Sequence, residues 1–435
     1  MISRIAAVNY RCLRNISQDL DRFHVLAGPN GSGKSTFLEV VRVLAAFARD
    51  GLDSVWDESK AQQIPELLFG GKAEPLPTGK LSHKAPPSFQ LAIEMQIPES
   101  VLDRLHRKNS ERKKSVRYEL EIGCRSLREV NDARIVAENL WLRNDASESN
   151  RSETVRADVP GRNNTKRDLI HGQSKTPAGW RKVASKSIAL NAYFKSETSD
   201  WNFTFKNDPR RSALSSLPDD ERFGLANWAK TSLTQGVRKL SLKGELMQRP
   251  CPPLKEKGFK PDGSTLPLVV QELRRDKIAF KSWLEHLQTI LPIQDVVAIE
   301  REEDKSTYLR VSYESGLQVP SWHVSEGTLR MMALTLLPYL PSDGTVFLVE
   351  EPENGVHPQA VEAVFQSLSS VYDGQVLVAT HSPILVGLIK PEQLLCFSKT
   401  PDGETDIVRG DRHPKLGQWQ GEFRLAQLFA AGVLS

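Results

Sequence analysis

Apolar and polar positions near the start of the chain alternate in a way that predicts strand, turn, strand, loop and helix. Residues 2–10 are apolar enough for a strand, and 24–27 form a shorter apolar strand that ends in a glycine-rich loop. After this loop, apolar side chains recur at helical spacing over 37–47, so that one face of a helix would be apolar. A strand that leads through a glycine-rich loop into a helix therefore opens the chain.

A stronger alternation of strands and helices marks the C-terminal part. Three short apolar runs have the length of buried strands, at 346–349, 375–379 and 394–398. Apolar side chains at helical spacing predict helices over 327–340 and 358–372, the second with a proline in its first turn. Strands that alternate with helices favour a parallel sheet covered on both faces, so we predict an α/β fold with a mostly parallel sheet.

The pattern between these two parts is less regular. Short elements are indicated at 89–97, 119–124, 268–290, 296–300 and 308–313, and of these only 268–290 has helical spacing. Two further segments predict loops. Residues 145–186 are rich in Asn, Ser, Arg and Lys, the composition of a mobile or disordered stretch, and 246–266 are rich in Pro, Gly and Lys. We therefore predict a mixed α+β region over 51–269 with flexible loops.

The composition is that of a globular protein and argues against several classes of function. The 435 residues are 39% hydrophobic and 26% charged, and no apolar run reaches the ~20 residues that a membrane helix needs. The first residues lack the basic and apolar regions of a secretory signal. The four cysteines follow no disulfide or zinc-binding spacing. We therefore expect a cytoplasmic protein without a membrane partner.

The net charge of +4 conceals an uneven distribution of charge along the chain. Lysine and arginine outnumber acids over 105–117, 151–186 and 236–260, whereas acids prevail from 340 to the end. Three basic runs in one segment favour a polyanionic partner, so we expect DNA or RNA to bind there without base-specific contacts. Solvated loops are the alternative interpretation of any single run.

The glycine-rich loop after 24–27 matches the phosphate-binding pattern GxxxxGK[ST], in the strand–loop–helix context that this motif requires. Its glycines let backbone N–H groups turn toward one anion, and the helix N-terminus adds a favourable dipole. Lys34 supplies a positive charge for the β- and γ-phosphates, and the Ser35 hydroxyl is a ligand for Mg²⁺. We predict that the nucleotide is bound by Asn30, Gly31, Ser32, Gly33, Lys34, Ser35 and Thr36. A glycine-rich structural turn is the alternative.

Two acids follow the apolar strand 346–349 directly. A buried parallel strand delivers the residues at its C-terminal end to the edge of the sheet where ligands bind. We therefore expect Glu350 to hold the Mg²⁺ shell and Glu351 to polarise the attacking water. Because Glu350 is longer than the aspartate that is usual at this position, a water-mediated metal contact is favoured over a direct one. An exposed acidic strand end is the alternative.

Polar residues at two other places suit a phosphate site. His381 follows the strand 375–379, where it could contact the γ-phosphate or the attacking water, and a structural histidine is the alternative. Ser325 and Gly327 lie at the start of the helix 327–340, where serine and glycine form an anion site or an ordinary helix cap. A second phosphate-binding helix start would have a role if two subunits faced each other. Each subunit would then complete the nucleotide site of the other.

These segments together resemble the ABC-type ATPase heads of the RecF, SMC and OLD group. Within this group the resemblance is strongest to the compact bacterial AAA-type ATPases, including those of phage-defence operons. It rests on five segments and covers about 1–50 and 270–400 of the chain, the segments being 9–13, 28–36, 325–330, 350–358 and 380–383.

The resemblance implies an ATP- and Mg²⁺-dependent head-to-head dimer with two nucleotides in its interface. In such a dimer Ser325 and Gly327 contact the γ-phosphate of the nucleotide on the partner. Residues 354–357 form the loop that runs between the two sites. The resemblance also implies that Arg11, after the first strand, reaches the phosphates.

The resemblance also sets the expected domains. One ATPase head would be formed by 1–50 and 270–435 together, with 51–269 as an inserted arm. A glutamine usually links the metal to the arm in this group, and the candidates here are Gln62, Gln63 and Gln90. Long coiled-coil arms are missing, and the 54 residues after His381 are too few for the nuclease domain of OLD proteins. Any nuclease activity should therefore come from another chain.

The predicted function is ATP binding and hydrolysis by a head that dimerises around the nucleotide and controls a nucleic-acid-linked process. By analogy with the group, this process is phage defence or DNA repair, with a separately encoded effector. An ATP-dependent scaffold or switch with little turnover is the alternative. The ATPase subunit of a membrane transporter is disfavoured, because 325–329 lack the transporter signature and the insertion is too long.

Overall fold

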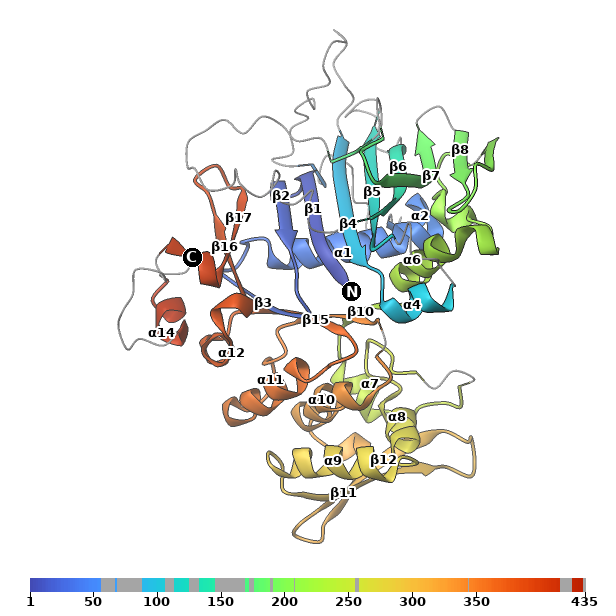
Figure 1. Ribbon diagram of the computed structural model, residues 1–435. Coiled ribbons are helices and arrows are strands. Elements are labelled where there is room, and N and C mark those ends of the chain that lie inside the picture. The colour runs from blue at the N-terminus through green and yellow to red at the C-terminus, as the bar shows by residue number, and fades with distance from the viewer. Residues whose placement is uncertain are drawn as a thin grey trace. The chain divides into compact units, whose positions relative to one another are not determined.

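The computed structural model describes most of the chain (Figure 1). The described residues are 1–55, 67–68, 88–105, 113–124, 133–144, 169–171, 176–187, 191–206, 208–254, 258–342, 344–414 and 425–432. The chain divides into two compact units, the first made of Met1–Asp21, Gly31–Val237 and Phe397–Ile407, the second of Arg22–Asn30, Arg238–Cys396 and Val408–Ser435. The division into a head of 1–50 and 270–435 and an arm of 51–269 stays a prediction.

An eight-stranded sheet forms the centre of the first unit. Its strands, in spatial order, are β2 (Leu13–Asp19), β1 (Ile2–Tyr10), β4 (Ser88–Gln96), β5 (Ser115–Cys124), β6 (Ala133–Arg143), β7 (Trp180–Ser187), β8 (Asn191–Lys195) and β9 (Asn202–Lys206). Every neighbouring pair of these strands is antiparallel. The strands predicted at 2–10, 89–97 and 119–124 are thus confirmed as β1, β4 and β5.

One strand of this sheet lies where the composition predicts a loop. Residues 180–186 belong to β7, so the loop predicted over 145–186 is wrong for this part. The strand carries few large apolar side chains, but its backbone pairs with β6 on one side and β8 on the other. Pairing on both sides offsets the weak apolar pattern that made the segment look like a loop. Residues 145–168 and 172–175 lie outside the described residues.

Helix α1 (Lys34–Asp50) packs against this sheet and against α6 (Gly224–Thr234). Its apolar face is buried, and the ring of Phe37 meets that of Phe397 edge-on with centroids 5.6 Å apart. The helix predicted over 37–47 is therefore confirmed and extends further at both ends. The shorter helices of this unit are α2 (Leu52–Val55), α4 (Glu99–Arg104) and the 3₁₀ helices Leu214–Ser216 and Glu221–Phe223.

A buried network of charges crosses the middle strands of the sheet. Arg117 on β5 donates to Glu119 and to Glu94 on β4, each at 2.7 Å. His171 Nδ1 lies 2.5 Å from the Glu119 carboxylate, and the Trp141 indole donates to that carboxylate at 3.0 Å. Burial alone would raise the pKa of Glu119, but the hydrogen bond with His171 and the charge of Arg117 together lower it to about 2. Glu119 is therefore ionised inside the sheet.

We predict that Glu119→Gln lowers the free energy of unfolding by about 3–5 kcal/mol near neutral pH, because the buried Arg117 loses a counter-charge. A carboxylate whose native pKa is lowered stabilises the fold above its unfolded pKa. This contribution disappears as the pH falls from about 4.5 through about 2. The difference between variant and wild type, measured by urea unfolding, should therefore shrink over that range.

The control for this prediction is Asp53→Asn, which breaks an exposed ion pair with Arg210. Exposed pairs of this kind contribute little, so the control should cost less than about 1 kcal/mol and show no comparable dependence on pH. Equal losses of stability in Glu119→Gln and Asp53→Asn would contradict the assignment of Glu119 as a buried, ionised group.

A second, mostly parallel sheet lies mainly in the second unit, and those residues of its last two strands that fall within Phe397–Ile407 belong to the first unit. Its strands, in spatial order, are β10 (Val237–Leu240), β14 (Val346–Glu350), β15 (Gln375–Thr380), β3 (Phe23–Ala27), β16 (Leu394–Lys399) and β17 (Thr405–Arg409). The neighbours β14 and β15, β15 and β3, and β3 and β16 are parallel. The four strands predicted for this sheet, and the mostly parallel α/β fold, are confirmed.

Two of the helices predicted for this unit are interrupted. The stretch 268–290 holds α8 (Leu266–Leu273) and α9 (Lys277–Gln288), because the Asp276 side chain accepts hydrogen bonds from two N–H groups of α9 and caps a new start. The helix predicted over 327–340 is α10 (Glu326–Thr335), followed by a 3₁₀ helix at Leu337–Tyr339. Pro338 lies in that 3₁₀ turn and has no N–H to continue the helix.

The remaining helices are short. The helix predicted over 358–372 is a 3₁₀ turn, Pro358–Ala360, followed by α11 (Val361–Ser369). The loop predicted over 246–266 contains the end of α7 (Gly244–Gln248). The others are α12 (Pro383–Leu388), α14 (Leu425–Ala430) and the 3₁₀ helices Ser321–His323, Pro391–Gln393 and Gly410–Arg412. None of the helices in the described part of the chain has the length and hydropathy needed to span a bilayer.

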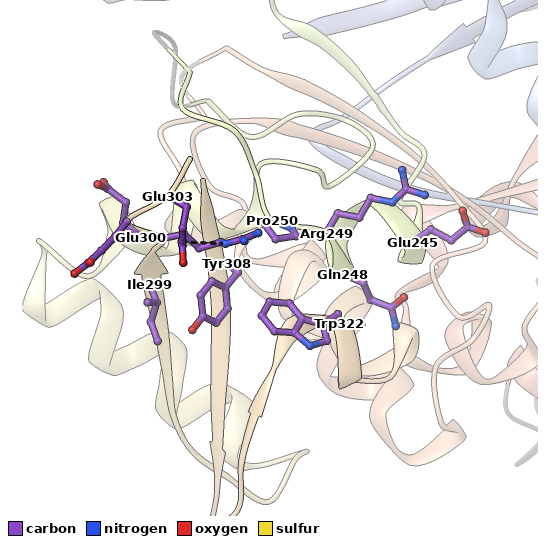
Figure 2. Close-up of a pocket in the computed structure, with 11 residues that line it drawn as sticks. Glu245, Gln248, Arg249, Pro250, Ile299, Glu300, Glu303, Tyr308 and Trp322 are labelled. Atoms are coloured by element: carbon purple, nitrogen blue, oxygen red, sulfur yellow. Dashed lines mark ion pairs between the residues drawn. The ribbon is translucent and has the colours of Figure 1, made fainter. Parts of the chain in front are cut away.

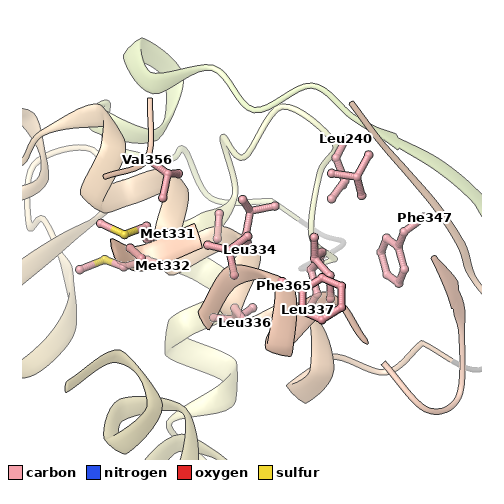
Figure 3. Packing of buried hydrophobic residues seen from close by; sticks show 14 of the residues in the cluster. Leu240, Met331, Met332, Leu334, Leu336, Leu337, Phe347, Val356 and Phe365 are labelled. Carbon is pink, nitrogen blue, oxygen red and sulfur yellow. The ribbon is translucent and has the colours of Figure 1, made fainter. Parts of the chain in front are cut away.

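A separate antiparallel sheet of three strands completes the second unit. It consists of β11 (Ile293–Glu300), β12 (Thr307–Tyr313) and β13 (Gln318–Pro320), so the strands predicted at 296–300 and 308–313 are confirmed. A hydrophobic core lies between the helices and the parallel sheet (Figure 3), with residues such as Met331 and Met332 of α10 and Phe347 of β14. This core fixes α10 against the strands that carry the polar residues of interest.

Candidate functional site

Three loops leave the parallel sheet at the same edge. In the parallel register, Thr380 at the end of β15 pairs with Ala27 at the end of β3, and the last residue of β14 pairs with the next-to-last residue of β15. The loops that begin at Gly28, Glu351 and His381 therefore follow neighbouring strand ends. Open parallel sheets bind their ligands at this edge.

Two glycines give the loop after β3 its turn. Gly31 and Gly33 have backbone φ angles of 75° and 104°, a region that favours glycine. A Cβ at Gly33 would overlap the Thr405 hydroxyl, which donates to the Ser32 carbonyl at 2.9 Å. Helix α1 then begins at Lys34 with no side-chain cap and no acid in its first turn. A helix start of this kind fits an anion such as a phosphate.

Arg11 is attached to the same helix. Its guanidinium pairs with Glu39 of α1 at 2.6 Å, and Arg42 pairs with the same carboxylate at 2.9 Å. Arg11 has a positive φ of 50°, and its backbone N–H donates to the Leu67 carbonyl at 2.7 Å. The residue is therefore held from both its backbone and its side chain, and its contact with phosphates stays a prediction.

Glu351 has a backbone conformation that is rare for its residue type. Its φ is 47°, in the left-handed region where residues other than glycine are strained. Its N–H donates to the Ala379 carbonyl at 2.8 Å, and Arg330 donates to its carbonyl at 3.3 Å. The Asn354 amide donates to its carboxylate. These hydrogen bonds hold Glu351 in a conformation that it would not favour alone.

His381 lies beside the Glu351 carboxylate. The imidazole Nε2 is 3.9 Å from Glu351 Oε1, and both side chains are partly exposed. The backbone N–H of His381 donates to Glu353 at 3.3 Å, and the Thr380 hydroxyl donates to the same carboxylate oxygen at 2.5 Å. The structure thus brings together the two residues predicted to be catalytic, and Glu353 links the loops that carry them.

Glu350, the predicted metal residue, forms an ion pair. Lys239 Nζ of β10 lies 2.9 Å from Glu350 Oε1, with the two side chains 41% and 27% exposed. A pair this exposed contributes at most about 1 kcal/mol, so the carboxylate can exchange its partner for a metal ion. Mg²⁺ is typically held by one or two carboxylates together with substrate phosphates, so the donor type fits this ion. No group of three or more metal-ligating side chains is found within the described ranges.

Ser325 and Gly327 define the start of α10. The Ser325 hydroxyl accepts a hydrogen bond from the Thr328 N–H at 3.2 Å, as an N-cap does. A Cβ at Gly327 would overlap the carbonyl oxygen of Gly355, in the loop that follows β14. The helix start therefore lies directly against this loop. The contact of both residues with the nucleotide of a partner stays a prediction.

Comparison with known proteins identifies the family. The family described as "AAA domain, putative AbiEii toxin, Type IV TA system" matches residues 23–387. The chain belongs to this AAA-domain family. The predicted resemblance to RecF- and SMC-like AAA ATPases is thereby confirmed, and the coarse function is that of a P-loop ATPase. A search of curated proteins finds no match.

Several solved structures resemble this AAA-domain protein. An SMC head bound to the C-winged helix domain of ScpA is 13% identical, with a TM-score of 0.51 over 94% of this chain and 97% of that chain. An SMC head with an extended coiled coil from Pyrococcus furiosus is 12% identical, with a TM-score of 0.48, over 94% and 95% of the chains. The SMC head from Thermotoga maritima is 11% identical, with a TM-score of 0.42, over 94% and 98%. At its identity, the first similarity shows the fold alone, which is that of a P-loop ABC-type head.

Some residues near the site of this AAA-domain protein were not foreseen from the sequence. Glu353 is the third acid of the run that starts at Glu350, and Lys239 lies in the basic run 236–260, so each had a weak signal. Arg330 lies in the segment 325–330 that carries the resemblance, but its contact with Glu351 was not predicted, and Thr405 had no signal. Both roles come from contacts between segments distant in sequence.

The candidate glutamines and two of the basic runs are only partly covered by the described residues. Gln90 is buried in β4 and accepts a hydrogen bond from the Leu169 N–H at 2.8 Å, and its link to a metal stays a prediction. Gln62 and Gln63, together with most of the basic runs 105–117 and 151–186, lie outside the described residues.

We predict that Gly33→Ala destabilises the protein more than Gly31→Ala. Both substitutions place a side chain in the left-handed region, at a cost of about 1 kcal/mol each. Only the Cβ at position 33 also overlaps Thr405 and approaches Cys12 Sγ to 3.1 Å, whereas the Cβ at position 31 meets just Lys399 Nζ at 3.8 Å. Thermal unfolding without nucleotide should show the larger loss of stability in Gly33→Ala. Equal midpoints for the two variants would contradict the close packing of this loop.

Proposed function

We propose that this AAA-domain protein binds ATP with Mg²⁺ and hydrolyses it. The observation that carries the proposal is the conformation of Glu351, which is held at a positive φ with its carboxylate 3.9 Å from His381 Nε2. Strained residues that are fixed by surrounding hydrogen bonds cluster at active sites. The pair also follows strand ends that neighbour the start of the phosphate-binding loop.

In the proposed reaction, the oxygen of a water molecule attacks the γ-phosphorus, and the bond to the bridging oxygen of the leaving ADP breaks. Glu351 orients this water and accepts its proton. His381 donates a hydrogen bond to the γ-phosphate or to the attacking water. Lys34 neutralises charge on the β- and γ-phosphates, and the backbone of Asn30–Gly33 and the start of α1 hold the phosphate oxygens. Ser35, Thr36 and Arg11 complete the predicted contacts.

Ser35 and Glu350 are the residues that would hold Mg²⁺. The ion, when bound, neutralises the charge that develops on the phosphates. Lys239 occupies the Glu350 carboxylate in this structure, and a direct or water-mediated contact with the ion would replace that pairing. The ion pair orients the Glu350 carboxylate until then.

The proposal extends to assembly. Two copies would face each other, with Ser325 and Gly327 of each contacting the γ-phosphate bound by the other, and with residues 354–357 between the two sites. The contact of Gly327 with Gly355 supports a joint role for these two segments. A separately encoded effector in phage defence or DNA repair, and DNA or RNA bound along the basic runs, remain the expected partners. A cytoplasmic location is expected for such a function.

We predict that Glu351→Gln binds ATP but loses turnover by about 10²–10⁴-fold, because the amide cannot accept the proton of the attacking water. Lys34→Ala should lose nucleotide binding itself. The measurements are phosphate release for turnover and a fluorescent ATP analogue for binding. Glu362→Gln, an exposed acid at the start of α11, is the matched control and should keep wild-type turnover.

Full turnover in Glu351→Gln would remove this residue from the reaction. Binding in all variants with negligible turnover in the wild type would favour the alternative function, an ATP-dependent scaffold or switch.

We further predict that Glu351→Gln accumulates as a dimer when ATP and Mg²⁺ are present. Because hydrolysis is blocked, the nucleotides that join the two copies persist, and light scattering should show twice the monomer mass. Adding duplex DNA should stabilise this dimer if the basic runs bind nucleic acid, and the effect should weaken as salt is raised. A mass that ignores ATP would contradict nucleotide-dependent dimerisation.

A further inference from the structure

A pocket outside the proposed ATPase site opens between α7 and the three-stranded sheet of the second unit. Its volume is about 840 Å³, within the range of ligand-binding pockets in proteins. Figure 2 shows Glu300 and Glu303 at one end, Gln248 and Glu245 at the other, and two aromatic rings between them. The pocket is therefore longer than one side chain, and each of its three parts has its own chemistry.

The two rings form a wall that suits a cation. Tyr308 of β12 and Trp322 of the 3₁₀ helix Ser321–His323 lie with ring centroids 4.9 Å apart, tilted by 46°. Trp322 is 44% exposed, although large aromatic side chains are usually buried. Tryptophan offers the most attractive ring face for an ammonium or guanidinium group. Tryptophan and tyrosine are also enriched at the energetic centres of protein interfaces.

The charges of the pocket favour the same kind of ligand. Four glutamates and two arginines line it, so acids are in excess. Arg301 is shared between Glu303 and Asp304 at 3.7 Å each, whereas Glu302 and Glu245 have no ion pair with any other described residue. A pocket with this balance attracts cations and repels phosphates and nucleic acids.

We propose that this pocket docks a partner protein through an arginine- or lysine-bearing segment. The cationic side chain lies over the rings of Trp322 and Tyr308 and pairs with Glu302 or Glu303. The backbone of the segment continues toward α7, where Gln248 and Glu245 offer polar groups. The length of the pocket favours a peptide over a single small cation, because one cation would use only one end of it.

The pocket is structurally linked to the start of α10. Gln248 donates to the Val324 carbonyl at 2.9 Å, and its own carbonyl accepts a hydrogen bond from the Ser321 hydroxyl at 3.0 Å. Trp322 lies shortly before Ser325, the N-cap of α10, in the sequence. A segment in the pocket would thus contact the turn that leads into the predicted γ-phosphate contact. That the docked partner is the effector rests on the proposed function.

The test uses a fluorescein-labelled peptide of alternating arginine and glycine, with the full chain and without nucleotide. Fluorescence anisotropy should show binding that Trp322→Ala weakens about tenfold, as expected for the loss of a cation–π contact with partial desolvation. The double variant Glu302→Gln/Glu303→Gln should weaken it similarly. The matched controls are Tyr372→Ala, an exposed aromatic outside the pocket, and Glu392→Gln, an exposed acid elsewhere in the unit. Both should bind as the wild type does.

Equal affinity of Trp322→Ala and Tyr372→Ala for the peptide, or no saturable binding to the wild type, would overturn the proposal. Equal binding of the same peptide with glutamate in place of arginine would also overturn it. Displacement of the peptide by spermidine, added at the same concentration of positive charge, would overturn the proposal as well. The pocket would then be a site for small cations. A change of oligomeric state in Trp322→Ala without peptide would identify a second copy of the chain as the occupant, which contradicts a separate partner.

The design separates this proposal from the ATPase function. Peptide binding is repeated with Lys34→Ala, which should not bind nucleotide and should still bind the peptide. If the peptide binds while the wild type binds ATP with negligible turnover, the ATPase assignment fails and the docking pocket stands. If Glu351→Gln loses turnover but the pocket variants bind the peptide as the controls do, the docking pocket fails and the ATPase assignment stands.

Discussion

The parallel register of β14, β15 and β3 is the constraint on which the candidate site depends. Because these strands run in the same direction and are in register, their C-terminal ends lie at one edge of the sheet. The loops that leave this edge start at Gly28, Glu351 and His381, far apart in sequence. An antiparallel arrangement of the same strands would send neighbouring loops to opposite edges. The strands are mostly apolar and almost entirely buried, which favours the parallel order.

Within this frame, hydrogen bonds hold the polar residues in place at a cost in backbone strain. Glu351 at a positive φ is unfavourable by of order 1–3 kcal/mol, and the bonds to its N–H, carbonyl and carboxylate offset this cost. Gly33 also has a positive φ, of 104°, but it adopts this angle without strain because glycine has no Cβ. The two positions show two ways of fixing the backbone of a loop at the candidate site.

The sequence predicts the parallel sheet and its helices well, because the spacing of apolar residues and the composition of each segment determine these elements. Two signals are visible in the local sequence alone. They are the apolar runs of β14 and β15 and the GxxxxGK[ST] loop between strand and helix. The break between α8 and α9 was missed because Asp276 as a cap outweighs an unbroken apolar stripe. β7 was missed because pairing with two neighbours stabilises it, and that pairing is not local. For the same reason the approach of Thr405 to Gly33 had no sequence signal, and the ion pair of Lys239 with Glu350 had only the weak signal of a basic run.

Gly327 and Gly355 meet without a side chain on either, and this has a mechanical consequence. There is no soft layer between the start of α10 and the loop after β14, because a single methyl group would already overlap a carbonyl oxygen. Packed backbone transmits displacement without the slack that rotatable side chains provide. A displacement of the first turn of α10 would therefore be passed directly to the loop that begins at Glu351.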